Sequence, residues 1–338
     1  MLTRFLRGHA ALTCAGVICL AACAGCGVVH TPTKLGPARR VVVAIDREPS
    51  ALYAPIYEGI ADGTFASGAL AVSVMPSGGG AQALRALSDG RATLAVTSEP
   101  ALLQARADGA HLVAIAALES GPLESIISLA NHPVTRPAQL VGKTVATTGT
   151  PLASAALRSF LAPAAITDSQ VRTIDAGADV ASPLLTRKAL ASVGGLWNYD
   201  AVALALAGRR PHVIRLTAAG VPTFSDLVVV ARVGEAHYGG AVLRAFLQSL
   251  TRSERAVRAN PAGVAKLLVS LNPSLSRRFE LAVLAASATE PQSAQVYGYQ
   301  PPTAWAAFAK WMNAHGLLGS PTPGGLAITD EFLPGQGE

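Results

Sequence analysis

Cysteine is nearly absent from this sequence. The 338 residues contain four cysteines, all within the first 26 positions, so the body of the chain has none. Zinc fingers, iron–sulfur sites, thiolate nucleophiles and structural disulfides are therefore excluded from that body. A chain of this length can bury enough apolar surface to fold on its core alone. We expect it to need neither a metal nor a cofactor.

Charge clusters and catalytic motifs are also scarce. Charged residues make up 14% of the chain, and no long run of Lys or Arg is interleaved with aromatic residues, which argues against a nucleic-acid partner. The seven histidines form no pair four residues apart and no HExxH motif, and there is no G-x-S-x-G elbow. Spacing alone leaves a Ser-His-Asp set open, but no pattern favours an enzyme.

Long apolar runs are confined to the N-terminus. There, two arginines precede AALTCAGVICLAA, which is too short to span a membrane and ends in small residues, as a secretory signal does. The run closes as LAAC, which resembles the bacterial lipobox. We therefore expect residues 1–22 to be a lipoprotein signal peptide, Cys23 to carry lipid and residues 23–38 to form a tether on an extracytoplasmic, membrane-anchored protein. An ordinary cleaved signal and acylation of Cys26 stay open as alternatives.

The body of the chain alternates short β-branched runs with amphipathic helical patterns, which predicts an α/β fold with parallel sheets. Strands are expected at 41–45, 70–76, 92–96 and 111–118, and, where the pattern starts again, at 143–149, 171–176, 190–195 and 212–217. Two more β-rich runs, 125–131 and 226–232, bracket the second group. We predict two α/β lobes joined by two crossing strands, with lobe 1 formed by residues 39–123 and 231–338 and lobe 2 by residues 124–230.

The loops that follow the strands are the candidate site, because ligands of open α/β sheets collect outside the carboxyl ends of the strands. Two lobes joined in this way can close on a ligand between them. The loop positions selected as ligand contacts are Glu48, Ser50, Tyr53, Gly79, Ser98, Glu99 and Thr150. Structural roles are the alternatives for some of them, such as a tight turn at Gly79 and helix capping at Glu99.

The segment GGLWNYD (194–200) places two rings, an amide and a carboxylate at the end of a predicted strand, in a chain with only three Trp and six Tyr. Trp197 and Tyr199 can stack on a planar ligand, and Asn198 and Asp200 can orient it through hydrogen bonds. An aspartate can also accept from an exocyclic amine and favour a protonated ring nitrogen. In the alternative interpretation Asn198 caps a helix, Asp200 complements its positive end and Trp197 belongs to the core.

The chain resembles the solute-binding proteins of ABC importers for thiamine pyrimidine precursors, the formylaminopyrimidine-binding group. The resemblance runs from about residue 41 to 334 and is carried by YAPIYEGIADGTF, LVGKTVATTGTPLASAALRSFL, GGLWNYDAVALALAG, GVPTFSDLVVVAR and YGYQPPTAWAAFAKWM, in this order. It implies a type II periplasmic-binding fold that clamps a small molecule between its lobes. It also implies an ABC permease and ATPase as partners, and we expect a monomer.

Members of this family place the aromatic and acidic residues of a W-N-Y-E motif near the pyrimidine, and the matching residues are WNYD (197–200). Asp200 shortens the acidic arm by one methylene, so whether it takes the role of the glutamate stays open. The first loop departs further from the family pattern DWxPNxxHAP. Here Arg47, Ser50 and Tyr53 replace its tryptophan, asparagine and histidine.

Taken as a sequence, the chain is predicted to be a solute-binding lipoprotein, not an enzyme, that delivers a small planar, nitrogen-heterocyclic, pyrimidine-like metabolite to an ABC importer. One alternative is an enzyme on the same scaffold, like the fungal pyrimidine synthases of this family. Those enzymes depend on a histidine in the first loop and a cysteine-rich motif, so Tyr53 and the cysteine-free body argue against it. A ligand-sensing receptor is another alternative, and for the ligand a flavin-like heterocycle or an aromatic sulfonate.

Overall fold

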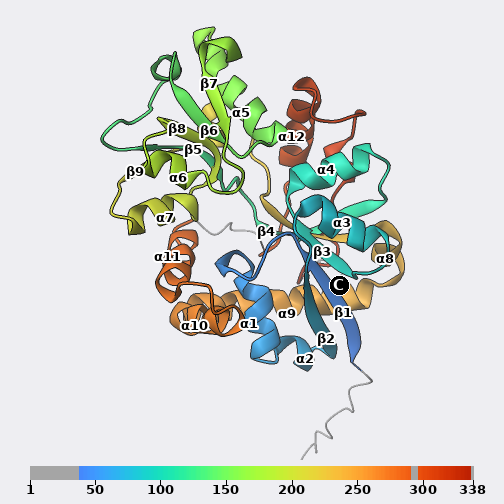
Figure 1. The fold of residues 1–338 in the computed structure, drawn as a ribbon. Helices are drawn as coiled ribbons and strands as arrows, with labels where there is room; N and C mark the ends of the chain where they lie inside the picture. The colour runs from blue at the N-terminus through green and yellow to red at the C-terminus, as the bar shows by residue number, and fades with distance from the viewer. Residues whose placement is uncertain (1–37, 291–295, 336–338) are drawn as a thin grey trace, which may run out of the picture. The chain divides into compact units, whose positions relative to one another are not determined.

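Two five-stranded sheets form the framework of the protein (Figure 1). The computed structural model describes residues 38–290 and 296–335, all of which belong to one compact unit, residues 36–338. The expected signal peptide and Cys23, with the expected tether as far as residue 37, lie outside the described residues.

The first sheet has the strand order β2-β1-β3-β10-β4. Its strands are β1 (Arg39–Ile45), β2 (Leu70–Pro76), β3 (Leu94–Thr97), β4 (Leu112–Glu119) and β10 (Leu227–Arg232). β1 is parallel to β2 and β3, whereas β10 is antiparallel to β3 and β4. Alternate residues of β1 point to opposite faces, and both faces are buried. Val43 and Ile45 share one apolar cluster with the helices on one side, and Ala44 belongs to the cluster on the other side.

The second sheet repeats this order as β7-β6-β8-β5-β9. Its strands are β5 (Glu124–Leu129), β6 (Thr144–Thr147), β7 (Arg172–Asp175), β8 (Ala191–Leu196) and β9 (Pro211–Arg215). β6 is parallel to β7 and β8, and β5 is antiparallel to β8 and β9. In both sheets, then, the fourth strand runs against its neighbours.

The antiparallel strand of each sheet is the one that arrives from the other sheet. The chain leaves the first sheet after β4, enters the second as β5, and returns as β10. The two predicted crossing strands are confirmed, but the expectation of purely parallel sheets is wrong. A strand that begins where the two sheets meet must run away from that place, whereas its neighbours end there. β10 begins at residue 227, so the chain rejoins the first sheet before the expected boundary at 230.

Helices cover both sheets (Figure 1). Those that follow strands of the first sheet, or lead back to it, are α1 (Ala54–Ala61), α2 (Thr64–Ser67), α3 (Gly80–Ser88), α4 (Glu99–Ala107), α8 (Val233–Tyr238) and α9 (Gly240–Ala259). The second sheet has α5 (Pro151–Leu161), α6 (Ala181–Leu185) and α7 (Asp200–Leu206). The last three helices are α10 (Pro261–Leu271), α11 (Arg277–Ser287) and α12 (Pro302–Ala314).

Short 3-10 helices connect many of these elements. They are η1 (Ala51–Tyr53), η2 (Pro137–Leu140), η3 (Ala162–Ala164), η4 (Asp168–Gln170), η5 (Leu216–Ala219) and η6 (Gly324–Leu326). Two of the described α-helices, α5 and α10, begin where the sequence supplies both a capping side chain and a proline. At α10, for example, the Asn260 side chain accepts a hydrogen bond from the backbone N–H of Gly263, and Pro261 occupies the first turn, where its missing N–H costs nothing.

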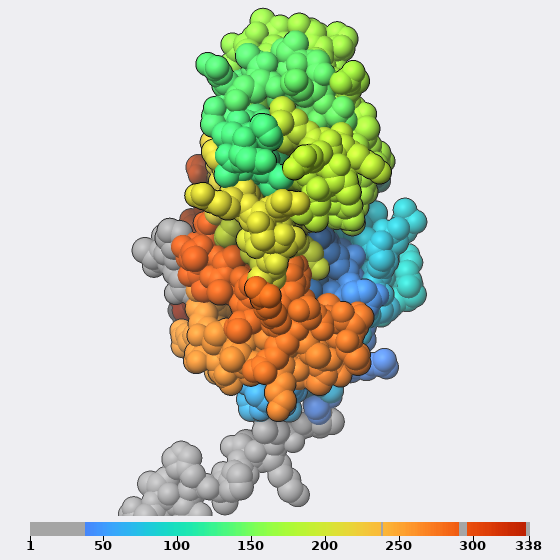
Figure 2. All heavy atoms as spheres, turned by 60° about the vertical axis from the view of Figure 1, so that its left-hand side comes forward, coloured from blue at the N-terminus to red at the C-terminus, as the bar shows by residue number. Residues whose placement is uncertain are grey.

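The C-terminal helices join the two lobes. α11 contacts both α7 of the second lobe and η1 of the first. In Figure 2 the orange surface that includes α11 adjoins the yellow and yellow-green surface of the second lobe. At the end of α12, the His315 ring lies 3.3 Å from the Ser159 hydroxyl of α5. The lobes are therefore held by direct contacts as well as by the two crossings.

Two further findings concern the described residues as a whole. No helix among them has both the length and the apolar composition needed to cross a membrane. In the same part of the chain, no group of three or more His, Cys, Asp or Glu side chains is arranged so that it could hold a metal ion.

Candidate functional site

The loop after β1 carries an acid that a buried tyrosine holds in place. The phenol of Tyr53 donates a hydrogen bond to the Asp46 carboxylate. Tyr53 is fully buried, so its ring belongs to the core, and only its hydroxyl reaches the loop. Burial raises the pKa of Asp46, and the hydrogen bond from Tyr53 opposes that rise. Tyr53 was expected to contact the ligand, and the structure instead places it beneath Asp46 as a support.

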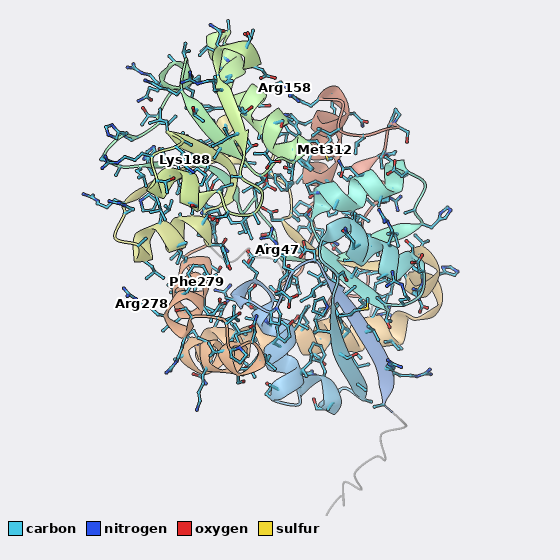
Figure 3. The ribbon with its side chains drawn as sticks, in the orientation of Figure 1. Arg47, Arg158, Lys188, Arg278, Phe279 and Met312 are labelled. Atoms are coloured by element: carbon cyan, nitrogen blue, oxygen red, sulfur yellow. The ribbon has the colours of Figure 1, made fainter. Side chains whose placement is uncertain are left out.

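Arg47 follows Asp46 and lies between the two lobes (Figure 3). Its guanidinium is exposed and makes no hydrogen bond or ion pair with the residues that the structure describes, but it lies within electrostatic range of Asp46, Asp200 and Asp226. Partial burial lowers the pKa of Arg47, and the surrounding carboxylates outweigh this effect, so the pKa is raised overall. Sequence reasoning noticed Arg47 only as a departure from the family pattern.

Two further acids belong to the crossing segments. The Asp226 carboxylate accepts hydrogen bonds from two backbone N–H groups, those of Leu123 and Glu124, the second at 2.9 Å. These bonds connect the second crossing segment to the first. Burial raises the pKa of Asp226 to about 6. Burial and the nearby Asp226 raise the pKa of Glu124 well above its usual value. Because the two N–H groups stabilise charge on Asp226, Glu124 is the member of the pair that keeps its proton.

Asp200 opens α7 at the end of the WNYD segment. Its carboxylate is largely buried and accepts a hydrogen bond of 2.6 Å from the backbone N–H of Leu196, the last residue of β8. Burial raises the pKa of Asp200 to about 6, although the bond from Leu196 and the charge of Arg47 both act to lower it. The charge of Arg47 in lobe 1 therefore stabilises the ionised form of Asp200 in lobe 2.

We call the set of Asp46, Arg47, Glu124, Asp200 and Asp226 the junction cluster. Arg47 is the electrostatic neighbour that all four carboxyl groups share. Both lobes and both crossing segments contribute to it. A group that binds among these residues would therefore contact every part of the chain that moves when the lobes open or close.

The aromatic residues of WNYD are already engaged within the chain. One face of the Trp197 ring is covered by the Arg215 guanidinium, which lies 3.7 Å from the ring centroid. The Tyr199 ring meets Phe279 of α11 edge to face at 4.7 Å between centroids. Any stacked ligand must therefore use the second face of Trp197 or displace Arg215.

Asn198 is fully buried, and its side-chain amide donates a hydrogen bond of 2.9 Å to the Ser287 hydroxyl at the end of α11. It does not cap α7, so that part of the structural alternative is wrong. The residue before α7 is Tyr199, and no side chain caps this helix. Asn198 instead attaches the WNYD segment to α11.

The other end of α11 holds the first loop of lobe 1. The carboxylate of Glu280 is fully buried and accepts a hydrogen bond of 2.7 Å from the backbone N–H of Ala51, just after Ser50. One helix thus fixes both the loop after β1 and the loop after β8. This arrangement joins segments that are far apart in the sequence.

The remaining candidates from the sequence differ in their surroundings. Glu99 is fully buried, and its carboxylate accepts a hydrogen bond of 2.8 Å from the Ser225 N–H, so it fastens a crossing segment. The Thr150 hydroxyl caps α5 by accepting from Ala153 N–H. Ser98 precedes α4 without a side-chain cap, and Gly79 precedes α3 with a φ of 149°, in the region that favours glycine.

Two candidates lie in the first loop beside Arg47. Ser50 is buried, and its hydroxyl has no hydrogen-bond partner among the described residues. Glu48 is exposed. Burial raises the pKa of Tyr57 to about 12, and the negative charge of Glu48 adds to this rise.

Several buried polar atoms around the junction cluster lack a hydrogen-bond partner in the described part of the chain. They are Ser50 Oγ, Glu124 Oε2, Trp197 Nε1, Asn198 Oδ1 and Glu280 Oε1. Most buried polar groups in proteins are paired, because an unpaired one costs about 1–3 kcal/mol. Both donors and acceptors are in this set, so a bound molecule or water with polar edges can satisfy it.

Comparisons with known proteins place the chain in a family. A family model described as "NMT1/THI5 like" matches residues 51–264. The formylaminopyrimidine-binding protein of Halalkalibacterium halodurans is 25% identical over 288 residues, which cover 83% of this chain and 87% of that protein.

Solved structures are similar at the level of the fold. The aliphatic sulphonate binding protein SsuA of Escherichia coli has a TM-score of 0.66 at 16% identity, covering 87% of this chain and 98% of that one. The nitrate-binding protein NrtA of Synechocystis has a TM-score of 0.62 at 13% identity, covering 87% of each chain. The protein therefore has the fold of the periplasmic binding proteins, as the sequence predicted.

Proposed function

Because this chain belongs to the NMT1/THI5-like family, we propose that it is an extracytoplasmic solute-binding protein for a small planar, pyrimidine-like metabolite, which it delivers to an ABC importer. The relative that is named for formylaminopyrimidine binding supports this ligand class. The binding-protein fold supports the role in transport, with a permease and its ATPase as partners.

The observation that carries the proposal is the junction cluster. Four carboxyl groups surround a single guanidinium, so the site favours a ligand with amine donors or a protonated ring nitrogen. Asp200 accepts from the exocyclic amine and the ring nitrogen of an aminopyrimidine, and Arg47 donates to a carbonyl on the same ligand. The same charge disfavours an aromatic sulfonate, which was the alternative.

The residues of WNYD contribute contacts around this centre. Trp197 offers the face that Arg215 leaves open and its unpartnered indole N–H, and Asn198 offers its unpartnered side-chain oxygen. Tyr199 lies in the WNYD segment after β8, and Ser50 and Glu48 lie in the loop after β1, so we propose all three as ligand contacts. Gly79, Ser98 and Thr150 stay proposed contacts from the remaining strand ends. We leave Tyr53 and Glu99 out of the contact set, because Asp46 engages the Tyr53 hydroxyl and Ser225 engages one oxygen of the Glu99 carboxylate, although the other oxygen, Oε1, has no partner among the described residues.

Closure follows from ligand contacts made in both lobes. A ligand that touches Arg47 in lobe 1 and Asp200 in lobe 2 gains both contacts only in the closed state, so binding shifts the population toward closure. No bond is made or broken in this mechanism. The family's fungal synthases need a histidine in the first loop and a cysteine-rich motif. This chain has Tyr53 in place of that histidine and no cysteine in its body, so we propose binding without turnover.

Attachment to the membrane completes the proposal. We propose that residues 1–22 are removed as a signal peptide and that Cys23 is acylated. The tether, residues 23–38, then connects the monomeric body to the membrane. Mass spectrometry of the protein from its own membrane would detect the lipid on Cys23, and an unmodified chain would refute the anchor without affecting the ligand site.

Calorimetry with three compounds tests the ligand class. Formylaminopyrimidine and a hydroxymethyl aminopyrimidine should bind one per chain and raise the melting temperature, since a ligand at a hundredfold excess over its Kd stabilises by about 2.7 kcal/mol. An alkanesulfonate is the matched control of similar size and opposite charge. Binding of the sulfonate in preference to the pyrimidines would refute the proposal.

A further inference from the structure

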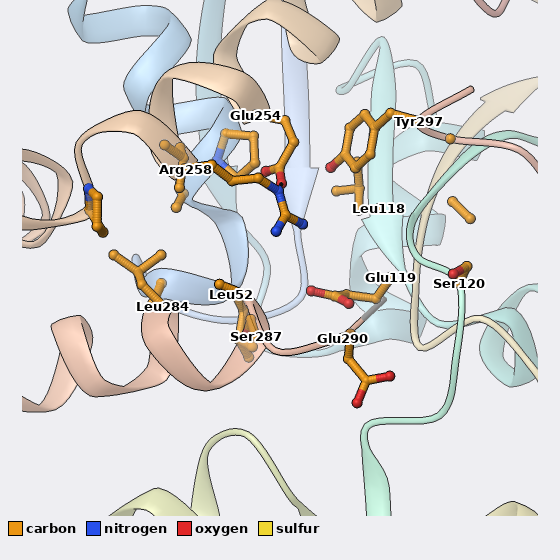
Figure 4. A pocket seen from close by; sticks show the side chains of 18 of the residues that line it. Leu52, Leu118, Glu119, Ser120, Glu254, Arg258, Leu284, Ser287, Glu290 and Tyr297 are labelled. Atoms are coloured by element: carbon orange, nitrogen blue, oxygen red, sulfur yellow. Dashed lines mark hydrogen bonds and ion pairs between the residues drawn. The ribbon is translucent and has the colours of Figure 1, made fainter. Parts of the chain in front are cut away.

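A separate cavity lies within lobe 1, apart from the junction cluster. Its volume is about 210 Å³, and neither the WNYD segment nor any member of the junction cluster lines it. Its walls come from η1 and the start of α1, the end of β4, the ends of α9 and α11, and residues 296–299. Five segments distant in the sequence thus enclose one space (Figure 4).

One side of this cavity is apolar. Leu52, Leu118, Val257 and Leu284 are buried side chains of this wall. A cavity of about 150 Å³ lined by such residues holds a benzene molecule. The larger volume here can therefore accept a ring or short chain of benzene size that carries one small polar group.

The other side of the cavity is polar, and its side chains converge on the empty space (Figure 4). Glu254 and Arg258, one turn apart on α9, form an ion pair of 2.6 Å. The Glu119 carboxyl and the Tyr297 ring point toward the same space, and neither has a hydrogen-bond or ion-pair partner among the described residues. Glu290, at the margin, is paired with Arg215.

Among the described residues, Glu119 is thus the carboxyl group of this polar side that has no ion-pair partner. Each of the other two carboxylates of this polar side has its own arginine. We propose that this cavity is a second ligand site, which takes a small organic cation, an amine or amidine on an apolar body, with its charged end on Glu119. Arg258 is already paired with Glu254, so it does not make the cavity an anion site.

The protonation of Glu119 supports this assignment. Burial, with the nearby charges of Glu254 and Asp226, raises its pKa to about 8, although Arg258 acts to lower it and Glu290 adds to the rise. Burial, Glu254 and Glu119 also raise the pKa of Tyr297 well above its usual value, so its hydroxyl stays neutral. Near neutral pH the empty cavity therefore keeps a proton on Glu119, and a bound cation takes the place of that proton.

Calorimetry with benzamidine as the probe tests this site directly. Benzamidine should bind one per chain, at least tenfold more tightly than benzamide, its neutral analogue, or benzoate, its anionic one. Because the cation displaces the proton of Glu119, its affinity should rise by up to tenfold per pH unit between pH 6 and 8 and level off above pH 8.

Two variants locate the bound cation. Glu119→Gln keeps the shape of the protonated acid, so it should fold normally while benzamidine binds at least tenfold more weakly and without pH dependence. Tyr297→Phe keeps the ring and should weaken binding by a smaller factor. Asp108→Asn, at an exposed turn after α4, removes the same charge and serves as the control.

Several outcomes would overturn the proposal. They are no binding of benzamidine up to millimolar concentration, equal binding of benzamide or benzoate, or full affinity in Glu119→Gln. Loss of benzamidine binding in Asp200→Asn with full affinity in Glu119→Gln would assign the cation to the junction cluster instead. Since pyrimidine binding is measured separately, failure at this cavity leaves the proposed function untouched.

Discussion

The loops after β3 and β8 occupy the same position in the two sheets. Each follows the strand next to the antiparallel one, and each leads into a helix whose first residue is acidic, Glu99 in α4 and Asp200 in α7. Each is also joined by its backbone to a crossing segment, through Glu99 N–H to Ser225 and Trp197 N–H to Leu123. In topology and in chemistry the two loops are counterparts.

Their surroundings differ. The Glu99 carboxylate is fully buried and binds the same residue, Ser225, as its own backbone N–H does, so both of its contacts go to one crossing segment. The Asp200 carboxylate accepts a hydrogen bond from Leu196, at the end of β8, and also interacts electrostatically with Arg47 of the other lobe. The first acid therefore fastens a crossing segment, and we propose that the second binds a ligand between the lobes.

This difference shows that an acid at the start of a helix does not by itself mark a binding site. The sequence selected both Glu99 and Asp200 as carboxylates just beyond a strand, and Asp200 also for its place in the WNYD segment. The partner that each acid already has is what separates a structural role from a binding role, and four predictions test this separation.

The largest expected effect is on stability, at Glu99. Glu99→Ala removes the acceptor of the buried Ser225 N–H, so the free energy of unfolding should fall by about 3 kcal/mol, measured by urea denaturation. Burial raises the pKa of Glu99 to about 8, so the acid is mostly protonated at pH 7 and Glu99→Gln should lose less than about 1 kcal/mol. A stable Glu99→Ala protein would contradict the structural role.

The next effect is on ligand affinity, at Asp200. Asp200→Asn keeps an oxygen that can accept from Leu196 N–H but removes the charge, so the affinity for the aminopyrimidine should fall about thirtyfold, or about 2 kcal/mol, with no loss of urea stability, because the amide avoids the cost of burying a charged carboxylate. Titration calorimetry measures the affinity. If Asp200→Asn instead lost stability and kept affinity, Asp200 would be a structural residue like Glu99.

The third effect is the pH dependence of stability without ligand. The pKa of Glu99 rises from 4.5 to about 8 on folding, and that of Asp200 from 3.8 to about 6. The folded state holds these protons more tightly, so this stabilisation is complete at acid pH and is lost as pH rises, with a slope of at most about 1.4 kcal/mol per pH unit for each acid.

The two acids should act in different pH windows. Glu99→Gln should flatten the stability profile between about pH 4.5 and 8, where Glu119 still contributes, and Asp200→Asn should flatten it only between about pH 4 and 6, so only the first variant changes the slope between pH 6 and 8. Urea unfolding at a series of pH values measures both profiles. The same flattening in both variants would mean that the two environments do not differ.

The smallest effect is electrostatic. Arg47→Gln removes a cation that lowers the pKa of Asp200, so that pKa should rise from about 6 by less than about one unit. The pKa of Glu99, which does not depend on Arg47, is the internal control. Carbon-detected NMR titration follows both carboxyl groups in one experiment, and an unchanged Asp200 would remove Arg47 from the junction cluster.

Much of the fold was predictable from local patterns. The expected strand 70–76 coincides with β2, and the strands of the second group lie within a few residues of their expected ends. β-branched runs and helix-start signals depend on neighbours in the chain, so they can be read locally. The direction of β5 and β10 could not be predicted locally, because it depends on where each strand enters a sheet formed by distant residues.

The site was predictable only in part. The WNYD segment was found because rare residue types are adjacent in it, but nothing in the sequence indicated that Asp200 lies within electrostatic range of Arg47. Asp46, Glu124 and Asp226 were not selected. The only signal for Asp226 was its place as the first residue of a predicted crossing strand, and for Arg47 the replacement of a family tryptophan.

The sequence by itself determined where strands and helices form, that the chain crosses twice between two lobes, and which loops carry polar and aromatic groups. Only the tertiary structure decided which of those groups already have partners: Tyr53 beneath Asp46, Glu99 on Ser225, Asn198 on Ser287. The physical reason is range. Periodicity and capping act over a few residues, whereas burial, hydrogen-bond partners and charge act through space between segments that the chain order leaves far apart.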